Sequence, residues 1–501
     1  MRIARHCFGK RSSPMAEHIR KLLRSTILYL PAQFAPPFVQ FVTTIAWTYL
    51  LDPATFGFVN FIIAVQEIVA YAGLTGWTLF VLRFRERFRD RGTERFVAMD
   101  QRMAALGALL QILLAPLVLF LLDLPLDAAT VAGTAAYLVT RMLVAHYSDW
   151  ARADHAIRAY SAAQIIASVA GAALSILAIL TYGPVAGVVL GAQAAGQALA
   201  IAALVLMKQF RFGLGAFDRE LFAELRRYAA PILVGGVIGW GAGNVIRVLV
   251  QYMDGPVALG LISVGWGVGQ RIASVLAMLL TAAAYPLAVK HYEDGDRRGA
   301  LAQVSFNGLL LFAVLLPAAV GLAMLAEPVV TLLIAEKFRE ATISVLPIAM
   351  AAASLRFLRI HTCEQSMFLV ERPALTLYVL SVEAVLNIAF CAIGLHVGGF
   401  SGAAAGMLIG TAITTFGAFA YCFVKLDLPP PSFAAILKIC AASGVMGLAL
   451  SVAETSAHAG ALAAAILSGA SIYAALILVF FPEIRALVAR RLQRAYSEAT
   501  L

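Results

Sequence analysis

The segment Leu50–Gly57, with the sequence LLDPATFG, lies between two long apolar runs and recurs in degenerate form as Tyr252–Gly260, YMDGPVALG. Each copy contains an apolar end, an Asp, a Pro and a Gly that begins another hydrophobic segment, and the two glycines lie 203 residues apart. Membrane transporters built from two related halves commonly keep their substrate site between the repeats. The repeat therefore predicts an internally duplicated transporter.

The amino-acid composition indicates a membrane protein. Hydrophobic residues make up 61% of the chain and charged residues 13%, whereas an ordinary soluble domain has about 25% charged residues. Apolar runs of about 20 residues, each long enough to span a bilayer as a helix, recur over the whole length. We therefore expect an all-α polytopic membrane protein with about 14 transmembrane helices. The expected spans are residues 25–48, 57–82, 103–122, 128–147, 160–181, 184–207, 229–251, 257–288, 301–323, 341–360, 374–396, 399–424, 433–452 and 459–481.

The distribution of basic residues predicts how these spans are oriented. Of the 38 Lys and Arg, 34 lie in the two terminal tails, in the gaps that follow even-numbered spans, or in the span ends that border those gaps, where Arg141, Arg356, Arg359 and Lys438 lie. Cytoplasmic loops carry such an excess, so we expect both termini in the cytoplasm. The net charge of +10 is spread over short loops beside anionic lipid, and nucleic acid is not expected as a partner. Because the five cysteines are scattered, we expect no metal or other cofactor.

The spacing of the repeat also predicts the domain organisation. Six spans separate the two copies, so both copies face the same side and the duplication is parallel. We expect an N-terminal half of helices 1–6 at residues 1–207, a cytoplasmic joining loop at 208–228 and a C-terminal half of helices 7–12 at 229–424. Helices 13 and 14 and a cytoplasmic tail then occupy residues 425–501.

Two helices in matching positions of the halves carry residues that weaken a helix. The first span contains Pro31, Pro36 and Pro37, and the seventh contains Gly239 and Gly241 within a glycine-rich stretch. Proline kinks a helix, and interrupted helices in matching positions indicate a moving binding site. Glycine and proline are also common in membrane helices without such a role. We assign these five residues as candidate hinges.

Several short motifs together resemble a known family. They are Leu50–Gly57, Val81–Phe84 with the sequence VLRF, Arg227–Pro231 with RYAAP, Val257–Leu261 with VALGL, and Ala326–Pro328 ahead of Lys337 and Phe338. The chain resembles the polysaccharide (O-antigen type) flippases of the multidrug/oligosaccharidyl-lipid/polysaccharide (MOP) exporter superfamily. The resemblance implies a MATE-like fold, with two six-helix halves and two further C-terminal helices.

The chain departs from that family pattern at two places. Ile246 stands where the family typically has an Asp, and Leu261 and Ile262 follow the Gly where it typically has a Tyr. These departures concern the identity of the substrate more than the fold.

Polar residues in the middle of spans are the candidate cavity residues, because an ionisable side chain there costs roughly 2.5–3.5 kcal/mol on insertion scales. Gln66 and Glu67 follow Gly57 by nine and ten residues, and Gln270 and Arg271 follow Gly260 by ten and eleven. A guanidinium binds phosphate with forked hydrogen bonds, so Arg271 is the candidate for an anionic headgroup. Glu67 would balance Arg271 or take up a proton. The alternatives are a static Glu67–Arg271 bridge or the pairing of each residue elsewhere in its own half.

Weaker candidates lie on other spans. Gln40, Asn244 and Arg247 are candidates for the lining of the cleft, although Arg247 lies close enough to a helix end to reach the interface. Glu383 and Asn387 share a helix face, which suits either a separate groove or a helix–helix hydrogen bond. The cluster of His146, Asp149 and Asp154 is expected to be solvated at the membrane interface.

The function that we expect is transport without catalysis. The resemblance implies a flippase that moves an undecaprenyl-diphosphate-linked oligosaccharide across the bacterial inner membrane by alternating access, as a step in lipopolysaccharide biosynthesis. Membrane lipids and other polysaccharide-assembly membrane proteins are the expected partners. The alternatives are a cation-coupled multidrug exporter or a lipid II flippase of the same superfamily. A multi-pass glycan polymerase, ligase or glycosyltransferase is disfavoured, because the gaps between spans are short and carry no catalytic motif.

Overall fold

The computed structural model describes residues 34–88, 93–121, 123–209, 213, 217–453, 457–486 and 490. This part of the chain is helical throughout, with short connections and no β-strand. Eleven of its helices are long and apolar enough to cross a membrane.

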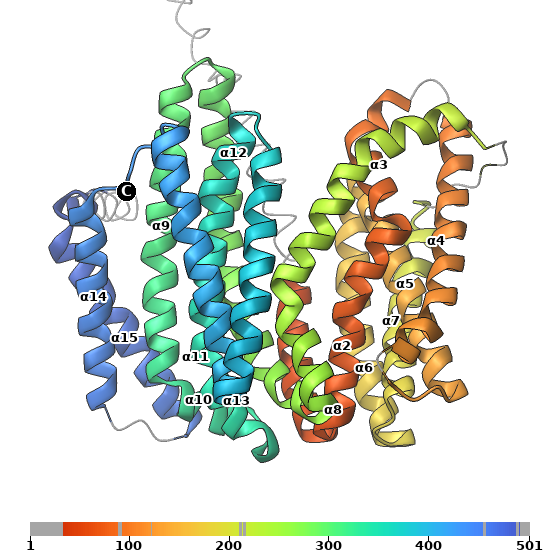
Figure 1. Ribbon diagram of the computed structural model, residues 1–501, viewed down its shortest axis with the longest axis horizontal. Coiled ribbons are helices and arrows are strands. Elements are labelled where there is room, and N and C mark those ends of the chain that lie inside the picture. The colour runs from red at the N-terminus through yellow and green to blue at the C-terminus, as the bar shows by residue number, and fades with distance from the viewer. Residues whose placement is uncertain are drawn as a thin grey trace, which may run out of the picture. The chain divides into compact units, whose positions relative to one another are not determined.

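The described residues form two compact units, which are drawn in Figure 1. The first contains the residues up to Thr43 and Val69–Pro231, and the second contains Thr44–Ile68 and the residues from Ile232 onward. Both α2 (Pro53–Ala70) and α8 (Arg219–Glu293) begin in one unit and end in the other. The domain limits expected above, including the joining loop at 208–228, stay a prediction.

The first unit is a set of closely packed helices. They are the π-helix η1 (Tyr71–Thr75), α3 (Gly76–Phe84), the 3-10 helix η2 (Arg85–Phe88), α4 (Thr93–Leu121), α5 (Ala128–Ala153), α6 (Ile157–Tyr182) and α7 (Ala186–Leu206). The contacts of α7 depend on glycine: a Cβ on Gly187 would lie 2.7 Å from the Cα of Thr130, and one on Gly196 2.8 Å from the carbonyl carbon of Ala170. Small residues allow such close approach where lipid gives helices no hydrophobic drive to associate.

The second unit contains the rest of α8 and the helices that follow it. They are α9 (Arg297–Met324), α10 (Ala326–Leu333), α11 (Glu336–Arg359), the π-helix η3 (Ile360–Glu364), α12 (Gln365–Leu369), α13 (Ala374–Lys425), α14 (Phe433–Val452) and α15 (Ala459–Phe480). Two long helices are interrupted by glycine: α8 at Gly255, and α13 at Gly398 and Gly399. Gly255 and Gly399 have φ angles of 81° and 57°, a conformation that glycine adopts without steric cost.

These interruptions explain how eleven helices match fourteen predicted spans. The two interrupted helices each cover two predicted spans, and the helix at residues 34–50 is the described part of the first span. Every predicted span therefore coincides with a helix, and the all-α membrane fold is confirmed.

The first copy of the repeat is a helix start. The Asp52 carboxylate accepts hydrogen bonds from the amide of Thr55 at 3.0 Å and from its hydroxyl at 2.6 Å, and Pro53 is the first residue of α2. Asp at the N-cap and Pro at the next position both favour a helix N-terminus. Partial burial acts to raise the pKa of Asp52, but these hydrogen bonds outweigh it and hold the pKa below its usual value.

The two copies of the repeat contact each other directly within the second unit. A Cβ on Gly57 would collide with the carbonyl oxygen of Pro256 and lie 2.6 Å from the amide nitrogen of Gly260. A Cβ on Gly260 would collide with the carbonyl oxygen of Pro53. The contact is reciprocal, and only glycine at both positions lets the two backbones approach so closely.

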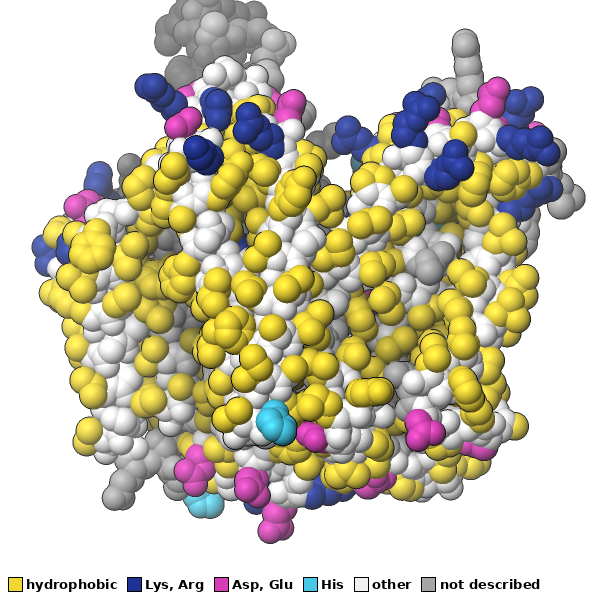
Figure 2. All heavy atoms as spheres, in the orientation of Figure 1, with side chains coloured by type: hydrophobic (Ala, Val, Ile, Leu, Met, Phe, Trp, Pro, Cys, Tyr) yellow, Lys and Arg dark blue, Asp and Glu magenta, His cyan; other side chains and the backbone are white. Residues whose placement is uncertain are grey.

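In each unit, hydrophobic side chains cover the middle of the helices, and Lys and Arg gather at one end (Figure 2). In the first unit this is the end where α3 finishes and α4 begins (Figures 1 and 2). The charge pattern follows the alternation of the sequence and is the pattern that orients helices in a membrane.

Candidate functional site

Two arginines of α8 converge in the second unit. Arg247 precedes the interruption at Gly255 and Arg271 follows it. A Cβ placed on Gly267 would lie 3.9 Å from Nη2 of Arg247 and 3.9 Å from Nη1 of Arg271. Both guanidiniums therefore reach the space beside Gly267, and they repel each other electrostatically. Two like charges brought together in this way favour an anion between them.

The hydrogen bonds of the two arginines orient their guanidiniums. Nη1 of Arg271 donates to the hydroxyl of Thr44 at 2.8 Å, and Nη1 of Arg247 donates to the side-chain oxygen of Asn244. The amide of Asn244 in turn donates to the carbonyl oxygen of Trp240 at 3.2 Å. Nε of Arg247 is buried without a hydrogen-bond partner. A buried donor without an acceptor costs free energy, because it has lost its hydrogen bond to water. A bound acceptor would satisfy it.

The polar residues of α2 lie in the same unit. Glu67 is exposed, and its carboxylate interacts electrostatically with Arg247. Gln66 beside it is buried, and Gln270 on α8 is partly buried. Two guanidiniums and one carboxylate leave a net positive charge at neutral pH. We call Arg247, Arg271 and Glu67 the arginine site.

The remaining candidates lie elsewhere. Gln40 is exposed on the helix at residues 34–50 and belongs to the first unit. Of the candidate hinges, Pro36 and Pro37 lie in that same helix, whereas Pro31 lies outside the described residues. Gly239 and Gly241 lie within a continuous helical part of α8, which is interrupted further along, at Gly255. The hinge assignment stays a prediction.

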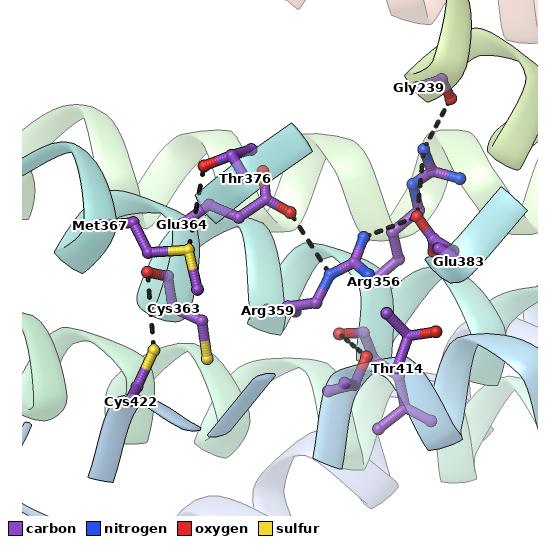
Figure 3. Close-up of polar contacts among 12 residues, drawn as sticks. Gly239, Arg356, Arg359, Cys363, Glu364, Met367, Thr376, Glu383, Thr414 and Cys422 are labelled. Atoms are coloured by element: carbon purple, nitrogen blue, oxygen red, sulfur yellow. Dashed lines mark hydrogen bonds and ion pairs between the residues drawn. The ribbon is translucent and has the colours of Figure 1, made fainter. Parts of the chain in front are cut away.

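A second ionic cluster, which the sequence analysis missed, joins α11, η3 and α13 (Figure 3). Nη2 of Arg359 lies 2.7 Å from Oε2 of Glu383, and Nε of Arg359 lies 3.3 Å from Oε1 of Glu364. Nη2 of Arg356 lies 3.7 Å from the same oxygen of Glu383. The side chains of Arg359 and Glu383 are fully buried, so each charge depends on the other for compensation.

This cluster corrects the reading of two basic residues. The sequence analysis grouped Arg356 and Arg359 with the basic residues beside a cytoplasmic gap, but both lie in α11, and Arg359 is buried. Their spacing of three residues at the end of an apolar span would have indicated two side chains on one helix face.

The cluster also forms a hydrogen bond to the glycine-rich part of α8. Arg356 donates to the carbonyl oxygen of Gly239 at 3.0 Å, as Figure 3 shows. One turn of α13 from Glu383, the side-chain amide of Asn387 donates to the carbonyl oxygen of Ala242 at 2.9 Å. Of the two interpretations of Glu383 and Asn387, the helix–helix hydrogen bond is therefore correct for Asn387.

The expectation that His146 is solvated is wrong. His146 and Asp100 are 1% and 3% exposed, and His146 Nε2 lies 2.8 Å from the carboxylate of Asp100. Asp154 pairs with Arg85 at 3.0 Å, and Arg85 is itself only 3% exposed although the sequence analysis counted it as a loop residue. Partners on neighbouring helices compensate these charges, and local sequence does not reveal such partners.

An apolar cavity of about 440 Å³ lies in the second unit. Its lining comes mainly from α9, α14 and α15, and includes Pro317, Leu325, Met446, Leu450 and Ile466. Among the described residues there is no group of three or more His, Cys, Asp and Glu side chains able to hold a metal ion.

Solved structures share this fold at low sequence identity. The lipid II flippase MurJ in an inward closed conformation matches with a TM-score of 0.74 and 14% identity, over 91% of this chain and 99% of that chain. An inward-facing multidrug resistance MATE family transporter of the MOP superfamily matches with a TM-score of 0.58 and 15% identity, over 82% and 98%. A MOP superfamily transporter from Pyrococcus furiosus matches with a TM-score of 0.53 and 14% identity, over 84% and 95%.

Sequence comparison gives the family. No curated protein sequence matches the chain significantly. The sequence profile of the polysaccharide biosynthesis proteins matches residues 22–291, which include both copies of the repeat and both arginines of the arginine site. The chain therefore belongs to the polysaccharide biosynthesis protein family and has the fold of the MOP superfamily.

Proposed function

We propose that this protein is a flippase that moves a lipid-linked oligosaccharide from the inner to the outer leaflet of the bacterial inner membrane by alternating access. Both termini then lie in the cytoplasm, on the side where the basic residues gather. The carrier is an undecaprenyl diphosphate, and the glycan is a precursor of a surface polysaccharide such as lipopolysaccharide. Family membership supports the link to polysaccharide.

The observation that carries the proposal is the arginine site. Arg247 and Arg271 reach the same space beside Gly267, and Nε of Arg247 is left without a partner. A guanidinium presents several donors in a fixed fork that matches phosphate oxygens. A diphosphate offers acceptors to both side chains at once, while the nearby Glu67 keeps the net charge small when no substrate is bound.

A lipid-linked substrate also needs a place for its hydrocarbon chain. The described part of the second unit has an apolar cavity lined by residues such as Pro317 and Met446, whose chemistry suits an isoprenoid tail. The rest of the tail stays in the bilayer, where its transfer costs nothing. The apolar cavity and the arginine site together supply the two kinds of environment that an amphipathic substrate requires.

The same charges disfavour a cation-coupled multidrug exporter. A cationic drug would meet two guanidiniums and one carboxylate, and the desolvated guanidiniums would repel it. We rank export of a cationic drug below transport of an anionic lipid for that reason.

The test replaces Arg271 and measures flipping. Arg271→Ala removes a charge-assisted contact of about 1.5–3 kcal/mol, so we expect at least a tenfold loss of glycan export in a flippase-deficient strain at equal membrane abundance. Arg271→Lys, which keeps the charge but loses the fork, should recover part of it. Arg298→Ala, at an exposed position near the start of α9, is the matched control and should export normally. Normal export by Arg271→Ala would refute the assignment of the arginine site.

A depletion experiment separates the two lipid-linked substrates. Accumulation of a surface-polysaccharide precursor on the carrier lipid supports the proposal. Accumulation of the cell-wall precursor lipid II instead would assign the protein to the other branch of the superfamily.

A further inference from the structure

Four buried polar side chains form a hydrogen-bond network in the first unit. Trp77 Nε1 donates to Oδ1 of Asp100 at 2.6 Å, and the same oxygen lies 2.8 Å from Nε2 of His146. Nδ1 of His146 lies 2.8 Å from the hydroxyl of Thr78, and that hydroxyl donates to the carbonyl oxygen of Leu74 at 3.1 Å. The four side chains are between 1% and 8% exposed.

The donors of this network determine how many protons it holds. When the Thr78 hydroxyl gives its hydrogen to Leu74, its oxygen accepts, and Nδ1 of His146 carries a proton. Nε2 of His146 and the carboxylate of Asp100 also share a proton at 2.8 Å, since two bare acceptors at that distance would repel each other. The His146–Asp100 pair therefore holds two protons in this arrangement.

The same atoms have a second arrangement with one proton fewer. If Nδ1 of His146 loses its proton to solvent, it becomes an acceptor, and rotation of the Thr78 hydroxyl supplies the hydrogen that it needs. Nε2–H continues to donate to Asp100. All polar atoms of the side chains keep a partner, which buried groups require. The rotation breaks one hydrogen bond, from the Thr78 hydroxyl to the carbonyl oxygen of Leu74.

Leu74 belongs to η1, the π-helix Tyr71–Thr75 that connects α2 to α3. π-helical turns are rare and occur frequently at functional sites. A change in the protonation of His146 therefore alters, through rotation of one hydroxyl, a hydrogen bond to η1. This irregular turn follows α2, which begins in the second unit.

Titratable and charged side chains lie on several of the elements around the pair. On α5 itself, the carboxylate of Asp149 is 28% exposed, pairs with Arg152 at 3.0 Å and interacts electrostatically with His146. Tyr147 faces both members of the pair. α3 and η2 bring Arg85, which is paired with Asp154 and stacked over Trp150. The other charged side chains of α4 (Glu94, Arg95 and Arg102) are exposed, α6 brings Tyr160 under Arg152, and α7 has no titratable residue.

We propose that the His146–Asp100 pair is a proton-binding site that controls η1, with Asp149 as the route of the proton to solvent. Binding of one proton to Nδ1 of His146 closes the hydrogen bond from Thr78 to Leu74, and loss of that proton opens it. In a transporter with such a site, proton binding changes the stability of one helix junction. The proton then binds two conformations of the junction with different affinities, as coupling requires. The use of this proton in transport rests on the proposed function, whereas the proposed binding of the proton does not.

The test measures hydrogen–deuterium exchange of residues 71–78 in the full-length protein in lipid nanodiscs between pH 5 and pH 9, corrected for the intrinsic effect of pH. In the wild type we expect protection to fall about fivefold over a single one-proton transition as the pH rises, the factor for one ordinary hydrogen bond. His146→Gln and Thr78→Val should abolish the transition. His155→Gln, at an exposed histidine near the end of the same helix, should keep it.

Two results would overturn the proposal: unchanged protection in the wild type from pH 5 to pH 9, or a transition that persists in His146→Gln. Thr78→Val preserves the shape of the side chain, so it tests the switch even if His146→Gln fails to fold. A protein that shows the transition but exports no glycan would refute the proposed function and leave the proton site intact.

Discussion

The contact between the two copies of the repeat allows a sharp test with a built-in control. Gly260→Ala places a methyl group against the carbonyl oxygen of Pro53, and backbone cannot move aside as a flexible side chain can. Gly241→Ala is the matched change in α8, because its Cβ meets no atom within 4 Å. Both substitutions gain about 1 kcal/mol of helix propensity, so the difference between them reports the crossing alone.

The expected difference follows from the cost of overpacking. An extra methyl group in a close-packed site typically costs about 1–3 kcal/mol, and the backbone obstacle places Gly260→Ala at the upper end. We therefore expect Gly241→Ala to be neutral or slightly stabilising and Gly260→Ala to be less stable than it by about 3 kcal/mol. Gly57→Ala should behave like Gly260→Ala, because the contact is reciprocal.

A thiol-reactive fluorescent dye provides the assay. Cys440 is exposed and reacts in the folded protein, whereas Cys363, Cys391 and Cys422 are buried and react only when the protein unfolds. The rise in dye signal on heating therefore reports the unfolding temperature in detergent. Equal unfolding temperatures for Gly260→Ala and Gly241→Ala would refute the reasoning, because the methyl group would then fit at the crossing without displacing a helix.

Three further predictions concern charge and space. Arg359→Met leaves the buried Glu383 carboxylate without its 2.7 Å partner, so the unfolding temperature should fall by the equivalent of about 3–5 kcal/mol; an unchanged temperature would contradict the pairing. Gly267→Leu inserts a side chain beside both guanidiniums of the arginine site, and export assays should show loss of flipping at normal thermal stability. Because the folded-state pKa of Asp52 lies below its usual value of 3.8, its contribution is present above about pH 4 and is lost as the pH falls through that lower pKa. Asp52→Asn should weaken this loss in thermal unfolding measured as the pH falls below about 4.

The helices could be predicted from the sequence because lipid constrains the backbone so strongly. A span must satisfy its own hydrogen bonds, so apolar length alone identifies it, and each predicted span coincides with a helix. The N-cap at Asp52, which the sequence analysis did not name, is equally local: Asp52 and Thr55 lie three residues apart and bond as such a cap requires. The contact of Gly57 with Gly260 was not predicted, because a repeat reveals duplication and not which surfaces meet.

The polar sites were harder to predict because compensation is not local. Arg271 was identified by its position in the middle of a span, but its hydrogen bond to Thr44 joins residues 227 positions apart. His146 was expected to be solvated, and Arg359 was grouped with the basic residues beside a cytoplasmic gap, because each lies near the end of a span. Both are buried because partners on other helices, Glu383 and Asp100, neutralise them. A single sequence shows a charge but not the distant residue that makes its burial possible.

The two copies of the repeat pack alike, but the polar side chains near them differ. When Gly57 is aligned with Gly260, Glu67 corresponds to Gln270, and Arg271 corresponds to the apolar Ile68. One residue turns a helix by about 100°, so Glu67 and Arg271 occupy different faces of related helices and are not equivalent positions of the repeat. The two arginines lie on either side of the second copy, whereas Thr44 and Glu67, which interact with them, lie on either side of the first copy. The backbone crossing had to remain symmetric because each glycine contacts the other copy, while the side chains about three turns further on, Glu67 and Arg271, were free to diverge in charge.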